Sequence, residues 1–173
     1  KEALAALGIA HRLEGLPFFV CLGFSMAVSP MVGQFLGAKD PLKAKQTVYL
    51  SLKITCSVLF GIAVIYFTFA PELCKLFTND PEIIRQCVLY LRMIVFFDVF
   101  LPLEVVLGGA FSGAGDTRPP FFIIFPITIL RVPLAYLVAA ILKWPIAWIW
   151  VVIIVTMVAK GILMLLVFSK GKW

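Results

Sequence analysis

The sequence predicts an all-α, polytopic membrane helix bundle with about five transmembrane helices, and three observations support this fold class. Hydrophobic residues make up 62% of the 173-residue chain and charged residues 14%, against about 45–50% and about 25% in soluble globular proteins. The apolar runs each approach the ~20 residues that a helix needs to cross the hydrocarbon core. None of them alternates apolar and polar residues in the pattern of a β-barrel. We therefore treat residues 1–173 as a single membrane domain.

The first three spans are separated by loops that carry helix-start signals. In "KDPLKAKQ", Asp40 is expected to cap a helix whose first residue is Pro41. In "FTNDPEIIRQ", Asp80 and Pro81 repeat this device before the third span. These acids therefore have a structural explanation rather than a catalytic one. The complete set of predicted spans is 16–36, 48–69, 89–112, 121–142 and 144–168.

The fourth span contains two prolines, Pro126 and Pro133, on either side of Arg131. Proline removes a helical hydrogen bond, so we expect the backbone ladder to break where neighbouring helices or water satisfy the freed groups. A broken membrane helix of this kind lines a cavity. The fifth span has tryptophans near its ends, where aromatic rings favour the headgroup layer: Trp144, Trp148 and Trp173.

The net charge of +6 is interpreted as membrane topology, because the basic residues lie in short loops between spans. No nucleic-acid partner is expected. Six basic residues fall on one face of the membrane, against five on the other, which favours a cytoplasmic C-terminus. The first set is Lys39, Lys43, Lys45, Arg118, Lys170 and Lys172, and the second is Lys1, Arg12, Lys75, Arg85 and Lys143.

The cysteines, at positions 21, 56, 74 and 87, lack metal-ligand spacing and are expected to be packing residues. Cys74 and Cys87 flank one loop, so a disulfide between them is geometrically feasible. His11 is the only histidine, and no HExxH or GxSxG motif occurs, so neither a metal, a cofactor nor an enzymatic activity is expected. The opening residues contain no signal peptide and resemble the middle of a longer protein.

A glycine motif of the form G-x-F-x-G-A-x-D occurs twice, as "GQFLGAKD" from Gly33 and as "GAFSGAGD" from Gly109. Glycines four residues apart let another helix approach closely, and Gly115 suits a helix end with positive φ. Both copies are expected on the same face of the membrane, through internal duplication or parallel constraints on two loops. The candidate packing and turn residues are Gly33, Gly37, Gly109, Gly113, Gly115, Asp116 and Arg118.

Three charges fall well inside apolar spans: Asp98, Glu104 and Arg131. Each costs about 2.5–3.5 kcal/mol near the bilayer centre, so such residues are rarely accidental. We interpret Asp98 and Glu104 as coupling-ion candidates and Arg131 as a buried counter-charge, with a structural ion pair as the alternative. The two acids are roughly 120° apart around a helix and need not face one partner. Lys53 and Lys160 lie nearer span ends and are expected to snorkel to the surface.

A carboxylate in a partly dry cavity can exchange a proton or a cation near neutral pH. Protonation or cation binding would favour one state of a transporter, and substrate would favour the other. This is the chemistry of an antiporter.

Several motifs together resemble the multidrug and toxic compound extrusion (MATE) transporters. They are "VGQFLGAKDPLKA", "LFTNDPEIIRQCVLYLR", "GAFSGAGDT", "LRVPLAY" and the terminal "GKW". The resemblance implies half of a two-lobe transporter, namely the C-terminal lobe without its first helix. It also implies secondary active multidrug efflux, in which organic, often cationic, compounds are exported by alternating access in antiport with protons or sodium. The implied partners are a small organic substrate, the lipid bilayer, and the N-terminal lobe or missing helices, in a bacterial or archaeal inner membrane.

The resemblance has two departures. In several family members a carboxylate on the helix equivalent to the third span helps to bind the coupling cation, and either Asp98 or Glu104 can occupy that place. Many relatives have arginine in the motif where this chain has Ser112, so a role of that arginine does not transfer.

Three alternatives come from other classes. "GAGD" matches the GxGD signature of intramembrane aspartyl proteases, but Asp98 and Asp116 lie on one helical run and not on neighbouring helices. A lipid-linked sugar flippase has related architecture. An inactive fragment is the third alternative, because alternating access requires a second lobe.

Overall fold

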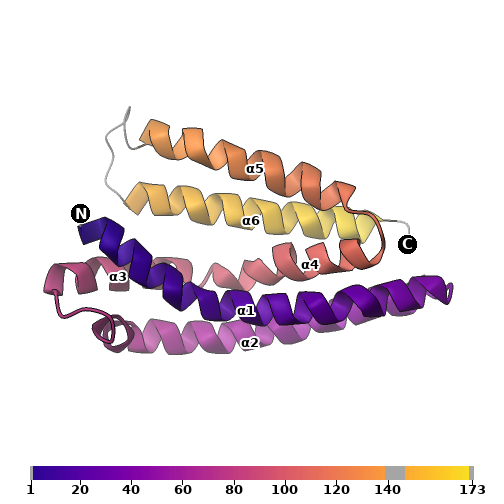
Figure 1. Cartoon of the computed structure of the whole chain (residues 1–173), viewed down its shortest axis with the longest axis horizontal. Helices are drawn as coiled ribbons and strands as arrows, with labels where there is room; N and C mark the ends of the chain where they lie inside the picture. Colours follow the sequence, from indigo (N-terminus) through magenta and orange to yellow (C-terminus); the bar gives the residue numbers. More distant parts are fainter. Residues whose placement is uncertain (1, 139–146, 172–173) are drawn as a thin grey trace.

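The computed structural model describes residues 2–138 and 147–171, and every regular element among them is a helix. Figure 1 shows the long helices running side by side along one axis, with α5 outermost and covering α6. Within the described ranges, four helices are long and apolar enough to cross a membrane, or five when the bent pair of α3 and the η1–α4 segment counts as one span. The predicted all-α membrane bundle is confirmed. The elements are α1 (Glu2–Gly37), α2 (Pro41–Lys75), α3 (Pro81–Ile94), the 3-10 turn η1 (Asp98–Phe100), α4 (Leu101–Gly113), α5 (Arg118–Tyr136) and α6 (Ala147–Lys170).

Helix α1 begins well before the predicted start of the first span at residue 16. Its membrane-length apolar part runs over Ala6–Gly37. Ala6, Ala10 and Leu13 recur at helical spacing and are buried, so the first turns pack against the bundle. The charged residues between positions 11 and 14 precede the predicted first span, but they lie within this continuous helix.

The third span is broken, whereas the described part of the fourth span is continuous, so the predicted break at its prolines is wrong. Helix α3 ends at Ile94 and η1 begins at Asp98, with a bend of 44° between the two halves of the span. Pro102 has no N–H to donate to the Asp98 carbonyl four residues earlier, and its ring crowds that carbonyl. Leu101 donates to the same carbonyl in a tighter 3-10 turn. By contrast, α5 continues through Pro126 and Pro133 to Tyr136.

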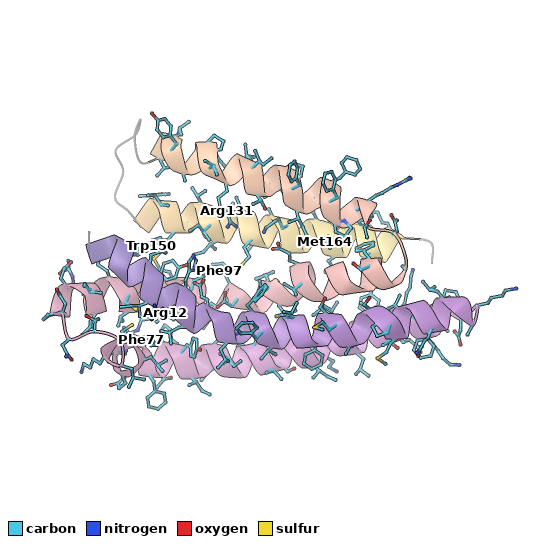
Figure 2. All side chains as sticks on the ribbon, viewed as in Figure 1. Arg12, Phe77, Phe97, Arg131, Trp150 and Met164 are labelled. Carbon is cyan, nitrogen blue, oxygen red and sulfur yellow. The ribbon has the colours of Figure 1, made fainter. Side chains whose placement is uncertain are left out.

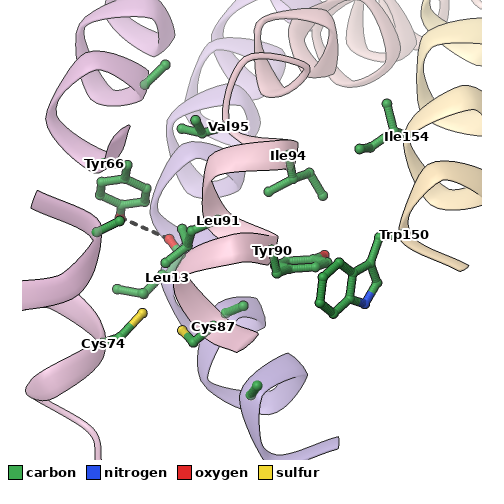
Figure 3. Packing of buried hydrophobic residues seen from close by; sticks show 14 residues of the cluster. Leu13, Tyr66, Cys74, Cys87, Tyr90, Leu91, Ile94, Val95, Trp150 and Ile154 are labelled. Atoms are coloured by element: carbon green, nitrogen blue, oxygen red, sulfur yellow. Dashed lines mark hydrogen bonds between the residues drawn. The ribbon is translucent and has the colours of Figure 1, made fainter. Parts of the chain in front are cut away.

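Two apolar clusters hold the bundle together, one toward each end. The first joins α1, α2, α3 and α6, and includes Tyr66 and Tyr90. The Tyr66 hydroxyl donates to the Leu13 carbonyl at 3.0 Å, and the Tyr90 ring is edge-on to Trp150 with ring centroids 5.2 Å apart. Figure 3 shows both pairs within the cluster. The second cluster joins α1, α2, α4 and α6 around Val32, Leu107, Met164 and others. Charged side chains of the spans lie between these clusters.

All four cysteines are free thiols, and three of them are buried. Cys74 and Cys87 face each other within the first cluster (Figure 3). The prediction that the cysteines are packing residues is confirmed for these two.

The glycine motif brings α1 and α4 into close contact. A methyl group at Gly109 would meet Ser25, and one at Gly113 would meet the Ser29 backbone. A methyl at Gly33 would lie 3.1 Å from the Gly113 carbonyl oxygen. These three glycines therefore lie where α1 and α4 pack closely, whereas a methyl group at Gly37 would have open space.

Each copy of the motif also ends a helix with the same capping turn. The Asp40 N–H donates to the Phe35 carbonyl at 2.9 Å, and the Asp116 N–H donates to the Phe111 carbonyl at 3.0 Å. The residue before each aspartate has positive φ, 74° at Gly115 and 59° at Lys39, as a Schellman turn requires. The predicted positive φ of Gly115 is confirmed. Each copy of the repeated motif ends one helix, and the two helix ends lie at the same end of the bundle.

The same end of the bundle carries the first set of basic loop residues. Lys45 Nζ donates to the Gly171 carbonyl at 2.9 Å, which places the described C-terminal residues beside the start of α2 (Figure 1). Arg118 begins α5 immediately after the second capping turn. Lys1, Lys143, Lys172, Trp144 and Trp173 lie outside the described residues.

Candidate functional site

A cavity of about 360 Å³ lies between the two apolar clusters, at the level of the break in the third span. Figure 2 shows Arg131 between α5 and α6, and Phe97 on the same side of the bundle, at the break in the third span. Helices α1, α4, α5 and α6 and the turn η1 all contribute side chains. The titratable residues that line it are His11, Glu14, Asp98, Glu104, Arg131 and Lys160. The three charges that the sequence singled out are therefore in one cavity.

Glu104 and Lys160 form a buried ion pair that joins α4 to α6. Lys160 Nζ donates to Glu104 Oε1 at 2.6 Å, and the two side chains are only 8% and 15% exposed. A methyl at Gly161 would lie 3.1 Å from the Phe100 carbonyl oxygen, so the absence of a side chain there lets the two segments approach. The prediction that Lys160 snorkels to the surface is wrong, because its amine has this partner. Lys53 is exposed, as predicted.

Asp98 is the first residue of η1, and its side chain is buried, with 6% of the residue exposed. The helix break turns it into the same cavity as Glu104, although a regular helix would separate the two acids by about 120°. No basic side chain among residues 2–138 and 147–171 lies within ion-pair distance of it. Asp98 is thus a buried carboxylate whose counter-charge is not another side chain of the described chain.

Glu14 and Tyr90 are the site residues that sequence reasoning missed. Glu14 lines the cavity together with Asp98. Glu14 Oε1 and the Tyr90 hydroxyl oxygen are buried, and the two side chains interact with each other, whereas Glu14 Oε2 accepts from His11 Nδ1 at 2.9 Å. Glu14 was missed because it precedes the predicted first span. An intramembrane position for it would have required extending that helix through the charges of residues 11–14.

Arg131 lines the cavity, but its partner is a hydroxyl and not an acid. Its Nε donates to Thr156 Oγ1 of α6 at 3.0 Å. The Thr156 hydroxyl in turn donates to a backbone carbonyl of its own helix, Val152 at 2.8 Å. Within the described ranges, no carboxylate lies within 4 Å of the guanidinium. The counter-charge of Glu104 is therefore Lys160, and a neutralising role for Arg131 stays a prediction.

The motif residues lie away from this cavity, at the end of the bundle. Asp116 is exposed and accepts from the Arg118 N–H at 3.3 Å. Between Asp98 and Asp116 runs the whole of α4, whose 13 residues span about 20 Å. Asp98 and Asp116 therefore do not form the aspartate pair that the protease alternative requires.

Comparison with known proteins identifies the family. The MatE family model matches residues 1–137. The chain belongs to the MatE family. Among its relatives, the probable multidrug resistance protein NorM of Thermotoga maritima is 32% identical over 177 residues, which cover 99% of this chain and 37% of that protein. The FAD transporter of Shewanella oneidensis is 31% identical over 141 residues, which cover 79% of this chain and 30% of that protein.

The fold also has a counterpart among solved structures. The crystal structure of the eukaryotic MATE transporter AtDTX14 superposes with a TM-score of 0.90 at 21% identity, covering all of this chain and 39% of that one. At this identity the likeness concerns the fold. The chain thus spans about a third of the length of the relatives that it matches. As a MatE family member with membrane-length apolar helices, it is an integral membrane protein.

Proposed function

We propose that this chain forms part of a secondary active exporter of organic compounds, with Asp98 as the acid that binds the coupling proton or sodium ion. The observation that carries the proposal is the asymmetry between the two intramembrane acids. Glu104 has a 2.6 Å partner in Lys160, so its charge is already compensated. Asp98 is buried without a basic partner among the described residues, and a proton or cation would supply the missing compensation.

The surroundings of Asp98 support ion binding. Glu14 lines the same cavity as Asp98 and adds carboxylate oxygens to it, and the Tyr90 hydroxyl interacts with Glu14. Oxygen atoms are the ligands that hard cations such as sodium prefer, and a carboxylate without a counter-charge suits a proton equally well.

The export direction and the substrate class follow the family. Relatives carry the names multidrug resistance protein and FAD transporter, so organic compounds of mixed charge are the proposed substrates. Alternating access needs a second wall facing the cavity, which the remaining helices of a two-lobe transporter would provide. We place the capped helix ends of both glycine motifs, with the C-terminus, in the cytoplasm.

The proposal is tested by gradient-driven transport of a fluorescent organic cation in proteoliposomes. The transporter containing this chain is compared with its Asp98→Asn variant and with Glu72→Gln, which removes an exposed acid at the end of α2. We expect Asp98→Asn to lose transport under a proton or a sodium gradient while inserting normally, and Glu72→Gln to retain it. Normal gradient-driven transport by Asp98→Asn would contradict the proposal.

A further inference from the structure

Arg131 is the one cavity charge that the coupling scheme above leaves without a role. It lies on α5, in an apolar span with mean hydropathy 1.5, where a charged side chain is costly unless it is paired or functional. Its one hydrogen bond to a described residue uses Nε and goes to Thr156. The two terminal nitrogens donate to no described residue, and the Arg131 side chain lines the cavity.

The other charges of the cavity do not need Arg131. Glu104 is neutralised by Lys160 at 2.6 Å. Glu14 accepts from His11 at 2.9 Å. Asp98 lies beyond ion-pair distance of the guanidinium in the described structure and is the proposed ion site. What remains is a forked, permanently charged donor that lines the cavity and is held at Nε by Thr156.

We propose that Arg131 binds an anionic group of the transported compound, a carboxylate or a phosphate, so that the substrate class includes organic anions and zwitterions. This deepens the proposed function and rests on it. A guanidinium with both terminal nitrogens available presents two parallel N–H donors, which match the two oxygens of a carboxylate or phosphate. Thr156 is the positioning residue, because its hydroxyl fixes Nε and thereby the plane of the fork.

The cavity favours a ligand with one anionic group at its rim over a fully anionic one. Asp98 and Glu14 line the same space, so negative charge far from Arg131 would be repelled, whereas a cationic or neutral body would be tolerated. About 360 Å³ accommodates part of a drug-sized molecule. The remainder would extend toward the second lobe.

The test uses two probes that differ by one phosphate, riboflavin and flavin mononucleotide, in fluorescence-quenching titrations of the purified transporter containing this chain. In the wild type we expect tighter binding of the phosphorylated probe. Arg131→Gln should lower the ratio of flavin mononucleotide affinity to riboflavin affinity by about 10- to 100-fold, the range for a lost charge-assisted hydrogen bond. Arg131→Lys should restore part of the ratio, and Thr156→Val should lower it less. Lys53→Gln, which removes an exposed cation on α2, is the matched control and should leave the ratio unchanged.

Two results would overturn the inference. One is equal affinity of the wild type for both probes. The other is an Arg131→Gln variant whose ratio of flavin mononucleotide affinity to riboflavin affinity equals that of the wild type, as in the Lys53→Gln control. Riboflavin binding also reports folding, so a misfolded variant would lose affinity for both probes together. If Arg131→Gln misfolds, the affinity ratio of Arg131→Lys tests the inference instead. If organic-cation transport remains coupled to the gradient while the probes bind equally, the anion site fails and the proposed function stands.

Discussion

Removing the amine of Lys160 should destabilise the bundle severely, because it leaves the Glu104 carboxylate buried without its partner. The Nζ–Oε1 distance is 2.6 Å and the side chains are 8% and 15% exposed, so water cannot readily replace the lost contact. Breaking a buried pair on one side costs about 3–5 kcal/mol. With about 2–4 °C per kcal/mol for a chain of this size, the Lys160→Met variant should melt about 6–20 °C below the wild type in detergent.

The double variant Glu104→Gln with Lys160→Met should recover most of this loss, since replacing both charges of a buried pair is often close to neutral. A double-mutant cycle then gives the coupling energy. Lys53→Met, at an exposed site on α2, should change stability by less than about 0.5 kcal/mol. The reasoning is refuted if Lys160→Met melts with the wild type, or if the two substitutions are simply additive.

Three further outcomes follow from the packing and the helix ends. Gly113→Ala should separate α1 from α4 and lower the yield of folded protein, because the added methyl meets the Ser29 backbone. Gly37→Ala should be tolerated, and size-exclusion profiles and melting temperatures of the two variants check this contrast. Gly115→Ala should cost on the order of 1 kcal/mol, since φ is 74° and a side chain strains that conformation; thermal unfolding against Ala114→Gly measures it. Hydrogen bonds from the Lys43 side chain and, second, from the Lys43 N–H lower the pKa of the Asp40 carboxyl below its usual 3.8. The cap therefore stabilises α2 above that unfolded value and weakens as the pH falls through the lower folded pKa. Hydrogen exchange at the start of α2 should rise only below about pH 4 in the wild type, and an Asp40→Asn variant should lack this rise.

The fold class was predictable because composition and run length alone identify membrane helices, and the resemblance of the motifs supplied the family. The position of the helix break was not predictable, because a proline does not by itself determine where a membrane helix breaks. Pro126 and Pro133 are accommodated within α5, while Pro102 coincides with a 3-10 turn at a buried aspartate. Only the packing of the surrounding helices distinguishes these cases.

The site was predictable in part for a similar reason. Asp98, Glu104 and Arg131 stand out as charges in apolar runs, and they do line one cavity. Their partners could not be read from the sequence. Lys160 was close enough to a span end to suggest snorkelling, and the long-range contact with Glu104 across 56 residues has no local signature. Glu14 was missed because the neighbouring charged residues placed it before the predicted first span.

The central claim, that Asp98 carries the coupling ion while Glu104 and Lys160 form a structural pair, is tested most directly by ion release on substrate binding. Purified transporter containing this chain is loaded with protons or with radioactive sodium, and the ions released by a saturating organic substrate are counted. The account predicts release from the wild type and from the Glu104→Gln/Lys160→Met double variant, and none from Asp98→Asn. Undiminished release from Asp98→Asn, or its loss in the double variant alone, would contradict the account.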